Sequence, residues 1–304
     1  MKTTPTFNHV EWYWNRLRCM SVSEMIDRAG RRASHAMARR RSPGSVPHAR
    51  FELAGVRWLP REIPDTPGQV LVRANEVLAG HWRILGRGAI PLGFPPRWNR
   101  NPDNGALLPM SYGRTMSFLD PAESGDIKYL WEPNRHLELV CLAQAWQITN
   151  DARYLDAIGT ALDSWFVQCP YPLGPNWSSP LEADIRLVNW ATVWQLIGGL
   201  QSPLFAHPVG KVLRTDWLNS VWRHAEFIRG HRSRHSSANN HLIGELAGNH
   251  SLLVTLEENA VIGGAGSEVE RVLAERGLNV PVLRLGLPDR FIDHGEQGDR
   301  KSVV

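Results

Sequence analysis

Apolar side chains recur at helical spacing between residues 134 and 232, and this recurrence constrains the fold more than any other feature of the chain. The pair Asn150–Asp151 interrupts the pattern briefly, and two helices joined by so short a turn must run antiparallel. A second pair of helices follows a loop rich in Pro, Gly and Trp. The predicted helices cover residues 134–149, 152–168, 181–200 and 211–232. Hairpins that recur in this way predict an all-α fold, with helix pairs stacked side by side into a curved array or ring.

The chain divides by composition into four regions. The first is a basic, helical N-terminal segment, and the second is an irregular arm rich in Pro and Gly with one helix at 68–85. The third contains the helical hairpins and the polar motifs. The fourth has no sustained helical pattern beyond 268–277. The regions cover residues 1–41, 42–130, 131–255 and 256–304.

Charge and cysteine content exclude several classes of protein. The net charge is +4, and the cluster Arg39–Arg41 is either a polyanion-binding patch or a solvated basic face, which we favour. We therefore expect no nucleic-acid partner. Three cysteines without metal spacing predict neither a disulfide framework nor a metal site, and we expect no cofactor. No signal-peptide core or membrane-spanning run is visible, so the cytoplasm is the default location, with the periplasm as the alternative.

Three polar clusters follow or precede predicted helices, and alternate connections in a helical array gather at one end. They are 131–136, which contains Asn134, Arg135 and His136, the pair Asn176–Trp177, and 236–241. Cations, carboxamides and flat Trp rings suit an acidic sugar: Arg for the carboxylate, Asn for hydroxyls, Trp for the ring face. Thirteen Trp against five Tyr fits an aromatic groove, although large helical cores also use Trp.

Each of these residues also has a structural interpretation. Glu182 and Arg186 lie four apart on one helix, and such a pair is more often a surface ion pair than a ligand site. His136 near a helix start is as readily a hydrogen-bonded structural histidine. Asn239 is a good helix N-cap, and His241 beside it can pack against a neighbour.

The stretch Ser236–Glu245 carries the most specific chemistry. It reads as a helix start, so free backbone N–H groups accompany Asn239, Asn240 and His241 in a site suited to a carboxylate. Lytic cleavage of a uronic-acid polymer requires that carboxylate to be neutralised before the C5 proton is removed. A glycoside hydrolase would need two flanking carboxylates, and no pair among the glutamates stands out.

These motifs resemble the heparinase II/III-like polysaccharide lyases. The resemblance rests on Trp-Glu-x-Asn-Arg-His at 131–136, Asn-Trp-x-Ser at 176–179, Glu-x-x-x-Arg-Leu at 182–187 and the Ser236–Glu245 stretch, and it extends over about residues 8–250. It implies an incomplete (α/α) toroid, followed in full-length members by a β-sandwich domain that we expect to be absent here. It assigns carboxylate neutralisation to Asn240, with His241 beside it. The implied partner is an acidic polysaccharide, and relatives are linked to alginate and exopolysaccharide.

The chain also departs from that family. Such lyases use a Tyr some way past the Asn as acid or base, whereas the last Tyr here is Tyr171. Residues 287–289 read like the start of a family Leu-Pro-Asp-Gly segment, but Arg290 replaces the Gly. The final residues, 299–304, read like translated sequencing adapter. We therefore expect a fragment, frame-shifted near its end and with little lyase activity; a non-catalytic polysaccharide-binding or exopolysaccharide-assembly protein and an (α/α)-toroid hydrolase are the alternatives.

Overall fold

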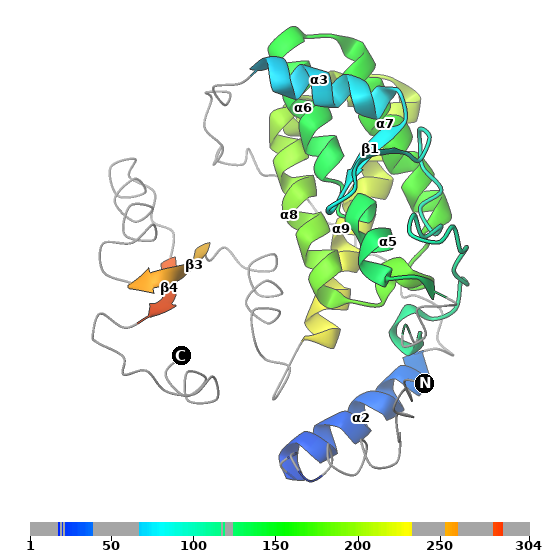
Figure 1. Cartoon of the computed structure of the whole chain (residues 1–304), viewed down its shortest axis with the longest axis vertical. Coiled ribbons are helices and arrows are strands. Elements are labelled where there is room, and N and C mark those ends of the chain that lie inside the picture. Colours follow the sequence, from blue (N-terminus) through cyan, green and yellow to red (C-terminus); the bar gives the residue numbers. More distant parts are fainter. Residues whose placement is uncertain are drawn as a thin grey trace, which may run out of the picture.

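The computed structural model describes residues 18, 20, 22–38, 67–116, 118, 124–232, 253–260 and 282–287. Four long helices form its main body (Figure 1): α6 (Leu137–Thr149), α7 (Ala152–Gln168), α8 (Pro180–Leu196) and α9 (Pro208–His231). The helical fold expected from the apolar periodicity is confirmed for these residues. Closure into a toroid is not tested by them and stays a prediction.

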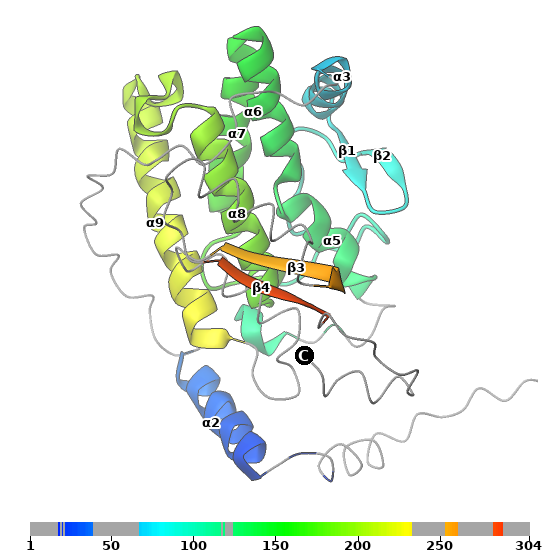
Figure 2. The same cartoon turned by 90° about the vertical axis from the view of Figure 1, so that its left-hand side faces the viewer.

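The four helices pack as two antiparallel hairpins in two layers. Helix α6 contacts both α7 and α8, and α9 contacts both α7 and α8, so the layers are α6 with α8 and α7 with α9. Figure 2 shows the helix axes running nearly parallel. Asp151 caps α7 by accepting a hydrogen bond from the Arg153 backbone N–H at 3.0 Å, and Asn150 adopts the left-handed conformation that ends α6. The sequence therefore specifies this hairpin locally.

Tryptophan fills much of the interior. Trp165 lies at its centre, with ring centroids 5.6 Å from Trp190 and 6.0 Å from Trp177. Six Trp side chains are essentially inaccessible to solvent: Trp82, Trp98, Trp165, Trp177, Trp190 and Trp217. Core packing, which was the alternative to an aromatic groove, therefore accounts for six of the thirteen Trp residues.

The arm before the hairpins differs from its prediction. Helix α3 (Pro67–Leu78) packs on α6 but ends well before residue 85, and an antiparallel hairpin of β1 (His81–Ile84) and β2 (Gly88–Pro91) follows it. Gly80 causes the break: its φ is +80°, and a Cβ there would meet the Gly93 backbone at 2.9 Å. Trp82 then inserts from β1 and donates to the Gly93 carbonyl.

Short elements shape one end of the body. Helix α5 (Ile127–Asn134) precedes α6, so the 131–136 motif spans a helix end and its junction, whereas we had expected a helix to begin at Asn134. The 3-10 turns η1 (Gly113–Thr115) and η2 (Pro175–Trp177) meet beside it. Two further turns, η3 (Gly199–Gln201) and η4 (Pro203–Phe205), join α8 to α9 at the opposite end.

Helix α2 and a pair of strands lie outside this body. Helix α2 (Val22–Ala38) carries an internal ion pair, Arg28–Glu24 at 2.7 Å. Strands β3 (Leu253–Ala260) and β4 (Val282–Leu287) pair in parallel, with Leu253 opposite Val282. In Figure 1 this strand pair lies to one side of the helical layers. A parallel pair is not an element of a helical-hairpin array.

Candidate functional site

The α5–α6 junction places Asn134 inside the protein. Its carboxamide N–H₂ donates to the carbonyls of Trp98 (2.9 Å) and Leu130 (2.8 Å), and its oxygen accepts from the Trp165 indole at 2.9 Å. The side chain is buried, and these three bonds use most of its hydrogen-bonding capacity. Asn134 therefore fixes the end of α5 against the arm and α7.

Arg135 joins the junction to the first turn of α8. Its guanidinium donates to both Glu182 carboxylate oxygens, at 2.8 and 2.9 Å, and to Glu132 at 2.7 Å. These hydrogen bonds, led by those to Glu182, raise the pKa of Arg135, while burial raises the pKa of Glu132. One cation thus faces two carboxyl groups, so Arg135 is not a free partner for a substrate carboxylate. Its side chain is 21% exposed, which leaves the group at the rim of the body.

His136 is buried among aromatic rings. Its Nδ1 accepts a hydrogen bond from the Trp190 indole at 2.8 Å, and its ring lies 5.1 Å from Trp98 and 5.6 Å from Trp165, centroid to centroid. Burial, followed by the charge of Arg186, holds the pKa of His136 well below its usual value. The neutral imidazole is therefore the form that the fold accommodates. A backbone φ of 64° makes His136 the left-handed link between α5 and α6.

Arg186 is a fully buried cation. Its Nε donates to the Asn134 carbonyl at 2.6 Å, its Nη1 lies 2.8 Å from His224 Nε2, and its guanidinium stacks on Trp165 at 4.6 Å. Burial lowers its pKa to about 10, so it stays charged at neutral pH. Arg186 therefore joins α8 to the end of α5 and to α9. The surface ion pair with Glu182, which the four-residue spacing also allowed, is not formed by this buried side chain.

His224 was not singled out from the sequence. Its Nε2 faces a guanidinium donor, so the proton belongs on Nδ1, which donates to the Ser220 carbonyl at 2.7 Å. Burial and Arg186 keep the pKa of His224 well below its usual value. A signal did exist: Trp217, Ser220, His224 and Phe227 form one stripe of α9, which places a histidine on the buried face.

The Asn176–Trp177 pair also faces inward. Asn176 donates to Asn99 Oδ1 (3.1 Å) and Cys169 Sγ (3.2 Å), and the Trp177 indole donates to the Cys169 carbonyl. Burial raises the pKa of Cys169 to about 12, so its sulfur remains a thiol. The Trp177 ring packs on Phe227 of α9, with 5.5 Å between the ring centroids. Its ring is used inside the body, whereas Trp131 at the rim is only half-buried.

These contacts bring the 131–136 and 176–182 segments together at one end of the helical layers. The Trp131 indole donates to the Pro175 carbonyl at 3.2 Å, and Arg135 bridges to Glu182. Helix α9 also ends here, because its last turns pack on Trp177 through Phe227. The chain therefore leaves α9 at this end, a few residues before the third motif. Asn239, Asn240 and His241 lie outside the described residues.

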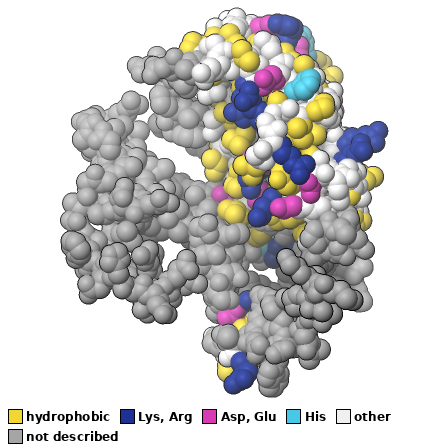
Figure 3. Space-filling view, in the orientation of Figure 1, with side chains coloured by type: hydrophobic (Ala, Val, Ile, Leu, Met, Phe, Trp, Pro, Cys, Tyr) yellow, Lys and Arg dark blue, Asp and Glu magenta, His cyan; other side chains and the backbone are white. Residues whose placement is uncertain are grey.

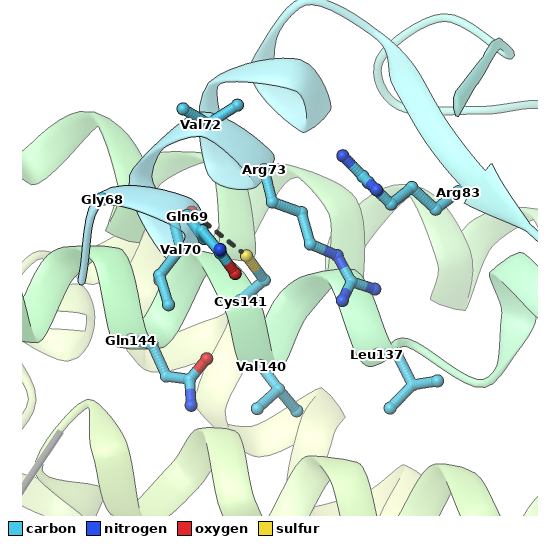
Figure 4. A pocket seen from close by; sticks show the side chains of 10 residues that line it. All are labelled: Gly68, Gln69, Val70, Val72, Arg73, Arg83, Leu137, Val140, Cys141 and Gln144. Carbon is cyan, nitrogen blue, oxygen red and sulfur yellow. Dashed lines mark hydrogen bonds between the residues drawn. The ribbon is translucent and has the colours of Figure 1, made fainter. Parts of the chain in front are cut away.

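One pocket among the described residues lies elsewhere. It has a volume of about 560 Å³, lies between α3 and α6, and contains none of the predicted site residues (Figure 4). Arg73 and Arg83 reach into it, but Arg73 pairs with Glu138 at 3.3 Å and Arg83 with Glu76 at 3.0 Å. The face of the helical body seen in Figure 3 mixes hydrophobic, basic and acidic side chains. Neither feature favours this pocket as an anion site.

Within the described residues, no three His, Cys, Asp or Glu side chains are grouped so that they could hold a metal ion. Cys141 and Cys169 are free thiols. Among the described helices, none combines the length and the apolar character needed to cross a bilayer.

Comparison with known proteins gives two matches to different parts of the chain. The family model described as "Heparinase II/III N-terminus" matches residues 98–258, and the one described as "Transketolase, C-terminal domain" matches residues 237–302. The 1-deoxy-D-xylulose-5-phosphate synthase of Dechloromonas aromatica (strain RCB) is 91% identical over 57 residues, which are 19% of this chain and 9% of that protein. The same enzyme of Azoarcus sp. (strain BH72) is 71% identical over 63 residues, 21% of this chain and 10% of that protein. The chain thus spans about a tenth of these curated relatives.

Among solved structures, the heparan sulfate lyase HepC from Pedobacter heparinus is similar with a TM-score of 0.47 and 17% identity, covering 62% of this chain and 25% of that chain. A mutant of the same lyase matches with a TM-score of 0.45. The heparinase match covers more than half of the chain, including the whole helical body, and confirms the resemblance carried by the 131–136 and 176–187 motifs. The chain belongs to the heparinase II/III N-terminal family.

Proposed function

We propose that the helical body of this chain is the carbohydrate-binding part of a polysaccharide lyase, and that its ligand is an acidic, uronic-acid-containing polysaccharide. The family match over 98–258 carries this proposal. The observation that supports it locally is the convergence of the α5–α6 junction, η2 and the end of α9 at one end of the layers. The Ser236–Glu245 stretch follows directly from that end.

The proposed roles separate into two groups. Asn240 and His241 neutralise the uronate carboxylate, which makes the adjacent C5 proton acidic enough to be removed, and Asn239 beside them contributes to substrate binding. Asn134, His136, Asn176, Trp177 and Arg186 position the surrounding segments from inside the body, as their burial and internal partners require. Arg135, which is partly exposed and paired with Glu132 and Glu182, lies at the rim that approaching substrate meets.

Catalysis by β-elimination also needs a group that removes the proton and one that protonates the leaving oxygen. No Tyr follows Tyr171 in the chain, and the Tyr171 ring packs on Trp177 with a centroid distance of 4.8 Å. Burial raises the pKa of Tyr171 further above neutrality. We therefore propose that this chain binds its polysaccharide with little or no turnover, and a purely binding role is the second candidate.

The test is a product assay on heparan-type, alginate and exopolysaccharide substrates, with wild-type protein and Asn240→Ala. We expect no unsaturated uronate, measured by ultraviolet absorbance, above the level of Asn240→Ala. Robust formation of unsaturated product would show that the chain supplies its own acid and base. New reducing ends without the unsaturated chromophore, lost on Glu132→Gln, would instead indicate a hydrolase that uses the rim carboxyl groups.

A further inference from the structure

We propose that this chain is a composite of two unrelated parts: a heparinase-type helical body, and a C-terminal segment, beginning between Glu245 and Leu253, that derives from a 1-deoxy-D-xylulose-5-phosphate synthase and is not part of the fold of the helical body. The two family matches carry this inference, because they describe different proteins and overlap only at residues 237–258. It does not depend on the proposed function.

The strand pair β3–β4 supports the division physically. Parallel strands need a long crossover connection, here residues 261–281, and parallel sheets occur in α/β folds with both faces covered. Helical hairpins contain no such unit. Each strand packs extensively on the other and neither does so on any of the described helices. The segment therefore has the local topology expected of an α/β domain and is foreign to the body that precedes it.

The join can be placed between Glu245 and Leu253. The heparinase-like motif ends at Glu245, and β3, the first strand of the parallel pair, begins at Leu253. A frame shift within 256–304 is the competing explanation of the unusual tail. An altered reading frame would not preserve 91% identity to another protein over 57 residues. The Leu-Pro-Asp run at 287–289 lies outside the heparinase match and inside the transketolase C-terminal match. We therefore assign this run to the synthase segment and not to the lyase family.

A two-stranded sheet is at best marginally stable without further strands or helices against its faces. The segment corresponds to only about a tenth of the synthases that it matches. We therefore expect weak hydrogen-exchange protection in β3 and β4, and strong protection in α6 to α9. The two parts should respond to substitutions separately, because few contacts couple them.

Hydrogen exchange on the full 304-residue chain, followed by mass spectrometry over a urea series, tests this. Leu142→Ala removes a fully buried side chain of α6, Leu285→Pro disrupts β4, and Val167→Ala, 74% exposed, is the control. Leu142→Ala should lower the urea midpoint of peptides from α6 to α9 and leave exchange in 253–260 and 282–287 unchanged. Leu285→Pro should leave the helical midpoint unchanged.

The outcomes distinguish a composite chain from a single cooperative fold even if one variant fails to fold. Strand peptides that are protected in wild type and keep their own midpoint in Leu142→Ala support a composite chain, whereas exchange at the unfolded rate in wild type would remove the structural support from β3 and β4. A common midpoint for strand and helix peptides that shifts together in either variant would overturn it. Neither result depends on carbohydrate binding or turnover, so failure here is separable from failure of the proposed function.

Discussion

At the residue scale, the polar side chains that resemble ligands are mostly internal connectors. Arg186 reaches from α8 to the Asn134 carbonyl and to His224, and His136 accepts from Trp190. Burying such groups is costly unless each finds a partner, so their hydrogen bonds specify how the helices meet. The same residue types serve a sugar-binding site, which is why the sequence left both interpretations open.

The two buried histidines make stability depend on pH. Burial and Arg186 lower the pKa of His136 and His224 in the folded state, so each takes up a proton on unfolding below its unfolded pKa, about 6.5. Their contribution is present above that pH and is lost as the pH falls. Each histidine steepens the pH dependence of the unfolding free energy by up to about 1.4 kcal/mol per pH unit below pH 6.

The variant His224→Gln removes one of these groups. We expect the unfolding free energy, from urea titrations followed by Trp fluorescence, to fall less steeply between pH 6 and 5, by about 1.4 kcal/mol per pH unit. Exposed His207→Gln is the matched control and should keep the wild-type slope. Burial raises the pKa of Glu138, so this residue changes the pH dependence of the unfolding free energy in the opposite direction. Its effect is the same in wild type and in both variants. Equal slopes for His224→Gln and wild type would refute this account.

At the element scale, the candidate site depends on how the arm meets η2. Gly113 of η1 lies so close to η2 that a Cβ would stand 2.4 Å from the Trp177 carbonyl oxygen and 2.8 Å from that of Gly174. Both contacts are with backbone, which cannot rotate away as a side chain can. The arm can therefore pack directly on η2 only because residue 113 has no side chain.

Gly113→Ala should force η1 and η2 apart. We expect a loss of about 1–3 kcal/mol in the unfolding free energy, the usual effect of overpacking, measured by urea denaturation. Gly230→Ala in α9 is the control, because nothing lies within 4 Å of the added methyl group and Ala favours a helix. The control should be unchanged or slightly stabilised. A Gly113→Ala protein as stable as wild type would show that the arm is not seated in this way.

The sequence predicted the elements best where local signals and packing agree. The α6–α7 hairpin was predicted closely because Asn150 and Asp151 end one helix and cap the next. The helix expected at 68–85 was too long, because the Trp82 position fits a helical stripe although Gly80 turns the chain into β1. Burial of Asn134 and Asn176 depends on contacts with Trp98 and Asn99, which are remote in sequence and leave no local pattern.

At the scale of the whole molecule, the chain joins a helical body of the heparinase II/III N-terminal family to a segment that matches a different enzyme. The family could be inferred from the sequence because several of its motifs lie in the helical body. The origin of 253–287 could not, since two short strands carry little local signal of their source. The binding site that we propose lies at the end of the helical layers from which the chain leaves α9.

The most direct test of this account is calorimetric titration of the full chain with an acidic, uronate-containing oligosaccharide and with a neutral one of equal length. We predict binding of the acidic ligand only, weakened at least about tenfold, or 1.4 kcal/mol, by Asn240→Ala. The control Val167→Ala should bind as wild type does, and buried Trp fluorescence verifies that each variant is folded. Wild-type affinity in Asn240→Ala, or equal binding of both oligosaccharides, would contradict the assignment of the site.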